Sequence, residues 1–120
     1  MHTSNLLARN WIRERFVEVT LFHTQANWPG ITVEAKIDTG ADRCSIDVGL
    51  AHALGWDIEG SSTVKNANGR QKRDYGSGTI SIEDEEFLMC ASFAERDTLS
   101  HPVLIGYELL LELLDLAEEE

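Results

Sequence analysis

A four-residue segment, Asp38-Thr39-Gly40-Ala41, directly follows an expected strand, and this junction constrains the fold more than any other part of the chain. Apolar residues occupy alternate positions of the preceding segment, Ile31–Ile37, which is typical of a half-buried β-strand. Glycine tolerates sharp backbone turns, so Gly40 is expected to turn the chain and to leave its N–H free to face the Asp38 carboxylate. The sequence therefore predicts an acidic side chain on a tight loop at a strand end.

A second motif lies near the other end of the chain, where the apolar triplet Val103-Leu104-Ile105 is closed by Gly106. The leucine-rich segment that follows is predicted to be a helix. A strand ending in Asp-Thr-Gly-Ala, then an apolar triplet closed by glycine, then a helix, is the pattern of retropepsin-like aspartic proteases. The sequence resembles that family from about Phe16 to Leu114, which is most of its length.

Short segments with alternating apolar residues dominate the rest of the chain. They predict a mostly β fold, a small closed retropepsin-like (acid protease) barrel with one or two short helices. Residues 1–15 are expected to form an N-terminal arm or helix, and residues 16–120 a single retropepsin-like domain, because a chain of this length supports one core. Strands are expected at 16–24, 31–37, 45–46, 79–82, 87–91 and 103–105, and helices at 47–54, capped by Asp47, and 108–117.

The composition argues against two classes of partner. The formal net charge is −11, whereas phosphate binding needs positive charge, so nucleic acid is not expected as a partner. No apolar run reaches the length of about 18 residues that a membrane span needs, so no membrane association is expected. The N-terminus lacks the basic start and apolar stretch of a signal peptide, which favours a cytoplasmic protein.

The residue spacing gives no indication of a metal or a cofactor. The chain has neither a Cys-x-x-Cys nor a His-Glu-x-x-His pattern, so no metal site and no cofactor are expected. Cys44 and Cys90 are expected to be reduced and buried rather than bridged. The segment from Ala94 to Gly106 also resembles a bacterial group named as ATP-dependent zinc proteases, with Arg96 matching an arginine of that group. Neither ATP nor zinc is carried over, because no nucleotide-binding loop or ligand cluster is present.

The resemblance implies a role for each residue of the first motif. Hydrolysis of a peptide bond needs an activated water and a proton for the leaving nitrogen, and two carboxyl groups that share one proton supply both. Because the chain has a single Asp-Thr-Gly, the resemblance implies a homodimer in which the Asp38 side chains of two copies meet at the two-fold axis. Thr39 would then brace the two loops across the axis, and Gly40 would leave room for the substrate backbone. The expected catalytic residues are Asp38, Thr39 and Gly40.

A polypeptide substrate is expected to lie between the first motif and a hairpin. Asn-Gly flanked by strand-forming residues is a strong hairpin signal, because both residues tolerate positive φ. The hairpin falls where the family carries its mobile flap, with which an extended peptide can pair through the backbone; a plain surface hairpin is the alternative. The residues expected to bind substrate are Ala41, Asp42, Asn66, Ala67, Asn68 and Gly69.

One position departs from the family pattern. The residue after the apolar-Gly motif is usually an arginine that pairs with an acidic residue just past the catalytic loop, and here it is Tyr107. Asp42 occupies the acidic position, and the candidates to replace its partner are Arg13, Arg43 and Arg96. The expected function is an aspartic endopeptidase, and the alternative is a catalytically inactive retropepsin-like domain that binds peptides or serves in assembly.

Charge is unevenly distributed along the chain. Four of the ten basic residues lie between Lys65 and Arg73, whereas the segment from Glu108 to Glu120 contains six acidic residues and no basic one. Both segments fit ordinary solvated surfaces. The alternative is that the basic segment favours acidic substrate residues or docks the acidic C-terminal tail.

Ala41 generates a prediction for the pH dependence of proteolysis. A hydroxyl at this position would add a hydrogen-bond donor and favour the ionised carboxylate, and alanine cannot supply one. Activity is therefore expected to be highest at about pH 5–7 rather than in strong acid. A pH profile of kcat/KM on an unstructured protein substrate tests this, and an optimum below about pH 3.5 would contradict it.

Overall fold

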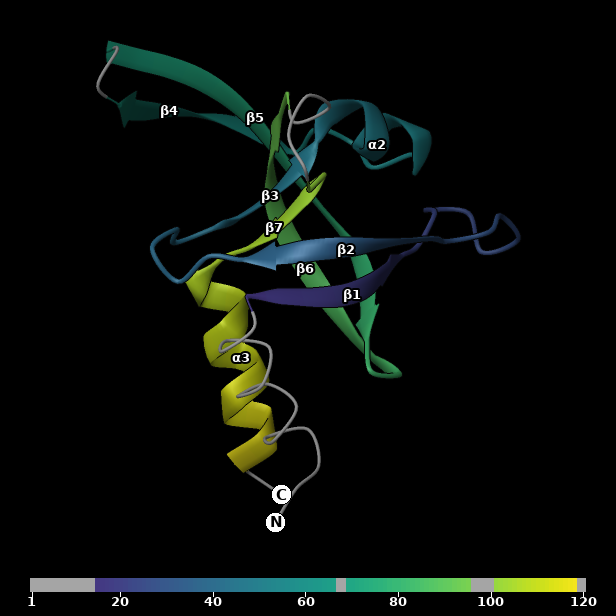
Figure 1. The fold of residues 1–120 in the computed structure, drawn as a ribbon. Helices are drawn as coiled ribbons and strands as arrows, with labels where there is room; N and C mark the ends of the chain where they lie inside the picture. Colours follow the sequence, from purple (N-terminus) through teal and green to yellow (C-terminus); the bar gives the residue numbers. More distant parts are fainter. Residues whose placement is uncertain (1–14, 67–68, 96–100, 119–120) are drawn as a thin grey trace.

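A computed structural model describes residues 15–66, 69–95 and 101–118 as a mostly β fold with two helices (Figure 1). The N-terminal arm or helix predicted for residues 1–15 lies outside the described residues except for Arg15. The strands are β1 (Phe16–Leu21), β2 (Ile31–Ile37), β3 (Cys44–Asp47), β4 (Gly60–Asn66), β5 (Gly69–Ile82), β6 (Glu85–Ala94) and β7 (Val103–Ile105), and the helices are α2 (Val48–Ala53) and α3 (Tyr107–Glu118).

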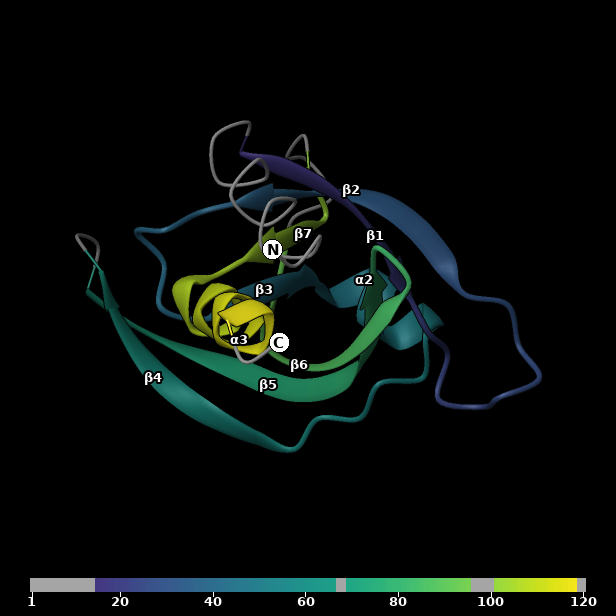
Figure 2. The ribbon, with the colours of Figure 1, turned by 90° about the horizontal axis from the view of Figure 1, so that it is seen from below.

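Six of the described strands close into a barrel, which confirms the predicted mostly β closed fold with one or two short helices; two helices are described. The hydrogen-bonded order is β1-β2-β7-β3-β6-β5, and antiparallel pairing of β1 with β5 completes the ring through Thr20–Ser81 and Leu21–Ile80. β4 pairs with β5 outside this ring. Viewed from below, the strands curve around the interior, and α3 is seen nearly end-on (Figure 2).

The alternation of apolar residues produces the core. Val17, Val19 and Leu21 of β1 point inward and are at most 6% exposed, as the pattern predicts. β1 nevertheless ends at Leu21, earlier than the predicted Thr24. The next carbonyl, that of Phe22, accepts a hydrogen bond from the indole Nε1 of the buried Trp56 at 2.9 Å, so the chain is tied to a side chain after the strand ends.

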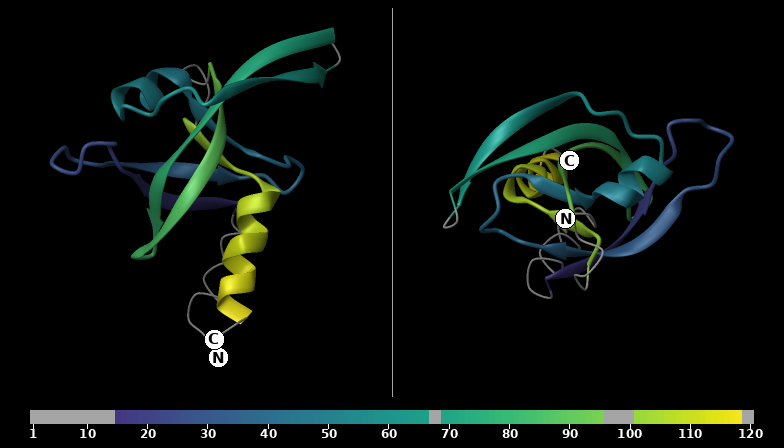
Figure 3. Two further views of the ribbon diagram at one scale, coloured as in Figure 1. Left: turned by 180° about the vertical axis from the view of Figure 1, so that it is seen from behind. Right: turned by 90° about the horizontal axis from the view of Figure 1, so that it is seen from above.

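The predicted Asn-Gly hairpin is present and is longer than expected. β4 and β5 pair from Gly60–Tyr75 to Asn66–Gly69, and Gly69 has a positive φ of 116°. The hairpin projects beyond the barrel (Figures 1 and 3). β5 continues without a break to Ile82 rather than starting at the predicted Thr79. Its Gly78 lies directly against the Trp56 ring, where an added Cβ would come within 2.0 Å, so glycine is needed for this close packing.

The helices and the tight turn follow their local signals. Asp47 caps α2 as predicted, with its Oδ2 accepting a hydrogen bond from the Leu50 N–H at 3.1 Å. The turn predicted at 83–86 is shorter, because Glu83 and Asp84 alone reverse the chain, both at positive φ. Neither helix of the described residues is long and apolar enough to cross a membrane.

β7 fixes the position of both predicted motifs. It lies between β2, which is parallel to it, and β3, which is antiparallel, so the end of β2 and the start of α3 are brought together. Gly106 follows β7 and packs against the Arg43 peptide, where a Cβ would lie 2.4 Å from both the carbonyl carbon and the oxygen. The glycine of the second motif is therefore required by its contact with the loop of the first.

The two cysteines are unbridged but differ in environment. Cys44 is 3% exposed and its Sγ accepts a hydrogen bond from the Gly106 N–H at 3.4 Å. Burial raises the pKa of the Cys44 thiol from 9.0 to about 11, partly offset by this hydrogen bond. The prediction that Cys90 is also buried is wrong, because Cys90 occupies an outward position in the alternation of β6.

Substituting Gly106→Ala should lower the free energy of unfolding by about 2–3 kcal/mol, because the rigid Arg43 peptide must move to admit the methyl group. Urea titration at fixed protein concentration measures this. Gly49→Ala in α2 is the control. Its Cβ would meet only the end of the Asp47 side chain, at 3.1 Å, so stability should stay within about 1 kcal/mol of the wild type. Equal effects of the two substitutions would contradict the assigned contact.

The thiols should differ in reactivity. At about pH 8 the exposed Cys90 should react readily with a thiol reagent, whereas Cys44 should react only on unfolding, because it is buried and its pKa is raised. Labelling followed by mass spectrometry distinguishes one adduct from two. The Cys90→Ser variant should give no adduct when folded and one in denaturant; rapid labelling of the folded variant would refute the burial of Cys44.

Candidate active site

Asp38 begins a tight turn at the end of β2. Its N–H donates to the Ile105 carbonyl at 3.0 Å, which extends the β2–β7 pairing one residue beyond the end of β2. The Gly40 N–H donates to the Asp38 Oδ1 at 3.0 Å, and the Ala41 N–H donates to the Asp38 carbonyl at 3.2 Å. These contacts confirm the predicted orientation of the Gly40 N–H toward the carboxylate and fix the direction of the side chain.

The remainder of the loop, residues 38–43, here called the catalytic loop after its predicted role, is held by the start of α3. The Tyr107 N–H donates to the Ala41 carbonyl at 2.7 Å, and the Glu108 N–H donates to the Asp42 carbonyl at 3.1 Å. Helix N-termini leave N–H groups without partners inside the helix, and here two of them bind loop carbonyls. The second motif thus supports the first through its backbone.

The exposed groups of the loop leave it open on one side. Asp38 is half-buried, whereas Thr39, Gly40 and Asp42 are exposed. No ion pair involving Asp42 is found among the described residues, and Tyr107 directs a 46% exposed side chain to solvent. Two of the arginines predicted as replacement partners, Arg13 and Arg96, lie outside the described residues. The third candidate, Arg43, is described and does not pair with Asp42.

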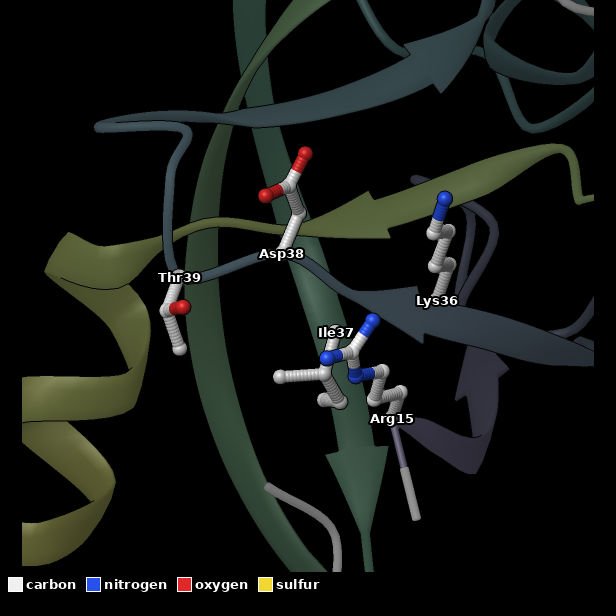
Figure 4. Close-up of a pocket in the computed structure, with 5 residues that line it drawn as sticks. All are labelled: Arg15, Lys36, Ile37, Asp38 and Thr39. Atoms are coloured by element: carbon white, nitrogen blue, oxygen red, sulfur yellow. The ribbon is translucent and has the colours of Figure 1, made fainter. Parts of the chain in front are cut away.

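A cavity of about 350 Å³ lies beside the carboxylate. It is lined by Arg15, Lys36, Ile37, Asp38 and Thr39 (Figure 4). The Asp38 and Lys36 side chains extend in the same direction from the chain, as alternate residues of an extended segment do, and the Arg15 guanidinium lies in front of Ile37 in this view. The cavity therefore combines one carboxylate with two cations.

Arg15 and Lys36 were not predicted as site residues. The signal for Lys36 was available, since it precedes Asp38 by two positions and shares its side of the strand. Arg15 could not be placed without the register of β1 on β2, which sets Phe16 opposite Lys36 and gives the Arg15 carbonyl a hydrogen bond from the Ile37 N–H at 2.7 Å. The structure thus adds two basic residues to the predicted set.

The predicted hairpin residues lie in part within the described structure. Asn66 and Gly69 pair at the end of the β4–β5 hairpin, and Ala67 and Asn68 lie outside the described residues. The hairpin projects on the same side of the molecule as the catalytic loop (Figures 1 and 3). Among the residues that the structure describes, no group of three or more His, Cys, Asp or Glu side chains is arranged to hold a metal ion.

Comparison with known proteins identifies relatives of this fold. The model of a family described as Aspartyl protease matches residues 24–109, more than half of the chain. No curated protein matches the sequence significantly. Among solved structures, the simian foamy virus (mac) protease superposes with a TM-score of 0.57 at 13% identity, covering 76% of this chain and 86% of the viral chain.

Two further structures are similar to this chain. The retroviral protease-like domain of Ddi1 from Leishmania major has a TM-score of 0.59 at 17% identity, covering 81% of this chain and 74% of that domain. A retropepsin-like aspartic protease from Rickettsia conorii has a TM-score of 0.55 at 19% identity, covering 81% and 69% of the two chains. At these identities the superpositions establish the fold, and the family match establishes the relationship. The chain belongs to the aspartyl protease family and has the retropepsin-like fold that its two motifs predicted.

Proposed function

We propose that this chain is an aspartic endopeptidase of the retropepsin type, acting as a homodimer in which two copies of Asp38 activate one water. The observation that supports this most directly is the Asp38 carboxylate itself. It is oriented by the Gly40 N–H, lies on an open loop at a strand end, and borders a cavity of about 350 Å³. A carboxylate held in one orientation on an open loop is suited to acid–base chemistry.

The proposed reaction needs a second carboxyl group, and among the described residues no other acidic side chain lines the Asp38 cavity. In the dimer the two Asp38 side chains would share one proton. The ionised carboxylate accepts a proton from water as the water oxygen attacks the peptide carbonyl carbon, and the protonated carboxyl donates its proton to the carbonyl oxygen. Return of the oxygen-bound proton and transfer of a proton to the nitrogen then break the C–N bond, which gives a carboxylic acid and an amine.

The loop supplies groups suited to a two-fold interface. Thr39 and Gly40 are exposed in the single chain, so both are available to a second copy. In the proposed dimer the Thr39 hydroxyl makes a hydrogen bond across the axis, and Gly40 leaves space for the substrate backbone. An isologous contact of this kind brings each residue next to its own copy, as the shared proton requires.

The substrate we propose is an extended polypeptide that lies between the loop and the β4–β5 hairpin. Hairpin residues 66–69, together with Ala41 and Asp42, would contact its backbone by strand-like pairing. The projection of the hairpin on the side of the catalytic loop supports this assignment. Two free cysteines are consistent with a reducing compartment, and we place the protein in the cytoplasm on that ground.

The test is the Asp38→Asn variant, which keeps the size of the side chain and removes its acid–base chemistry. The rate at which it cleaves an unstructured protein should fall by about a thousandfold or more. Mass spectrometry of the products measures this rate. Asp84→Asn is the matched control. Asp84 lies in the β5–β6 turn at positive φ, a conformation that asparagine accepts, so activity should not change.

Mass in solution completes the test. The wild type should be a dimer at the concentrations where it cleaves, and dilution that yields monomer should abolish cleavage. A wild type that remains monomeric and cleaves nothing, while still binding peptides, would reject the endopeptidase and support the inactive peptide-binding module instead. Cleavage that persists in Asp38→Asn would reject the assigned residue.

A further inference from the structure

The candidate site holds part of the positive charge of this acidic protein. The chain has a net charge of −11, yet all lysines and arginines within the described ranges lie in two places. Arg15, Lys36 and Arg43 lie in or beside the catalytic loop and its cavity, and the others lie on the β4–β5 hairpin. The hairpin set is Lys65, Arg70, Lys72 and Arg73. A local positive potential within an anionic surface attracts negatively charged groups.

The two cations of the cavity share it with a single carboxylate, that of Asp38. In the described part of the chain, neither Arg15 nor Lys36 forms an ion pair, and Asp38 is the one acidic residue that lines the cavity with them. In the proposed dimer the two Asp38 carboxyls share a proton and carry a single negative charge between them. Two such cavities contribute four cations, so positive charge remains in excess beside the reacting bond.

The backbone of both basic residues is held by hydrogen bonds to neighbouring strands. The Arg15 carbonyl accepts a hydrogen bond from the Ile37 N–H at 2.7 Å, and Lys36 belongs to β2, which is paired on both sides by β1 and β7. Arginine offers a planar fork for a carboxylate, and lysine offers a compact charge on a flexible stem. Because their backbone is already ordered, less conformational entropy is lost when they bind an anion.

From this arrangement we infer that the cavity lined by Arg15 and Lys36 is a subsite for an acidic side chain of the substrate. The inference rests on the proposed endopeptidase function and specifies its substrate class. Because Asp38 lines the same cavity, the acidic residue must lie within about two residues of the bond that is cut. The enzyme would therefore select Glu or Asp within about two residues of the scissile bond.

The first experiment reads specificity directly. A peptide library is digested with the wild type at low salt, and cleavage positions are identified by mass spectrometry. Acidic residues should be enriched within two positions of the cut. A matched pair of peptides, one with Glu and one with Gln at the enriched position, should differ about tenfold in kcat/KM. The ratio should shrink as salt is raised, because the interaction is between charges in an open cavity.

Variants then locate the effect. Arg15→Gln and Lys36→Gln should each move the Glu:Gln ratio toward one, Lys36→Arg should retain it, and Lys36→Glu should favour a Lys peptide over the Glu peptide. Asp84→Asn changes the net charge by one in the β5–β6 turn, where Asp84 does not line the cavity, and should leave the ratio unchanged. A Glu:Gln ratio of kcat/KM near one in the wild type would overturn the inference. So would an unchanged ratio in Arg15→Gln and Lys36→Gln if these variants only weaken the dimer.

Binding separates this inference from the proposed function. Fluorescence anisotropy with labelled Glu and Gln peptides measures the same preference in Asp38→Asn, which needs no catalysis. Tighter binding of the Glu peptide, lost in Asp38→Asn combined with Lys36→Gln, supports the subsite even if the wild type cleaves nothing. Equal binding of both peptides by Asp38→Asn, when the wild type cleaves them, rejects the subsite and leaves the endopeptidase standing.

Discussion

The close contact between Gly106 and the Arg43 peptide is the constraint on which the site depends. It allows β7 to pass beneath the catalytic loop and lets the first N–H groups of α3 reach the Ala41 and Asp42 carbonyls. The Asp38 N–H is tied to β7 in the same region. Residues that are far apart in the sequence therefore hold the loop that carries Asp38 in place through backbone contacts, which vary little with side-chain motion.

Much of this arrangement could be predicted from the sequence, because it rests on local rules. Alternation located β1 and β2, the Asn-Gly pair located the hairpin, and Asp47 located the start of α2. The prediction that the Gly40 N–H faces Asp38 is confirmed because three residues determine that contact. Local rules failed to predict that β5 is continuous before Thr79. Gly78 lies within this strand because it packs against the Trp56 ring, which is distant in sequence.

The candidate site was less predictable wherever it depends on register. Arg15 reaches the cavity because β1 pairs with β2 in one of several possible alignments, and the sequence alone does not choose among them. The exposure of Cys90 likewise follows from which face of β6 is turned inward. The charge pattern near Asp38 therefore becomes visible only when strands that are distant in sequence are paired, and the proposed substrate preference rests on it.

The pairing of β5 also determines where the hairpin can pivot. At Tyr75 the strand is bonded to Gly60 on one side and Ser92 on the other, and beyond it β4 and β5 form a ribbon of two strands. Below Tyr75, Gly76 and Gly78 are wedged against the Asp57 backbone and the Trp56 ring. A two-stranded ribbon is less well supported than a broader sheet. We therefore expect any movement of this arm to begin at Tyr75 and to leave the barrel unchanged.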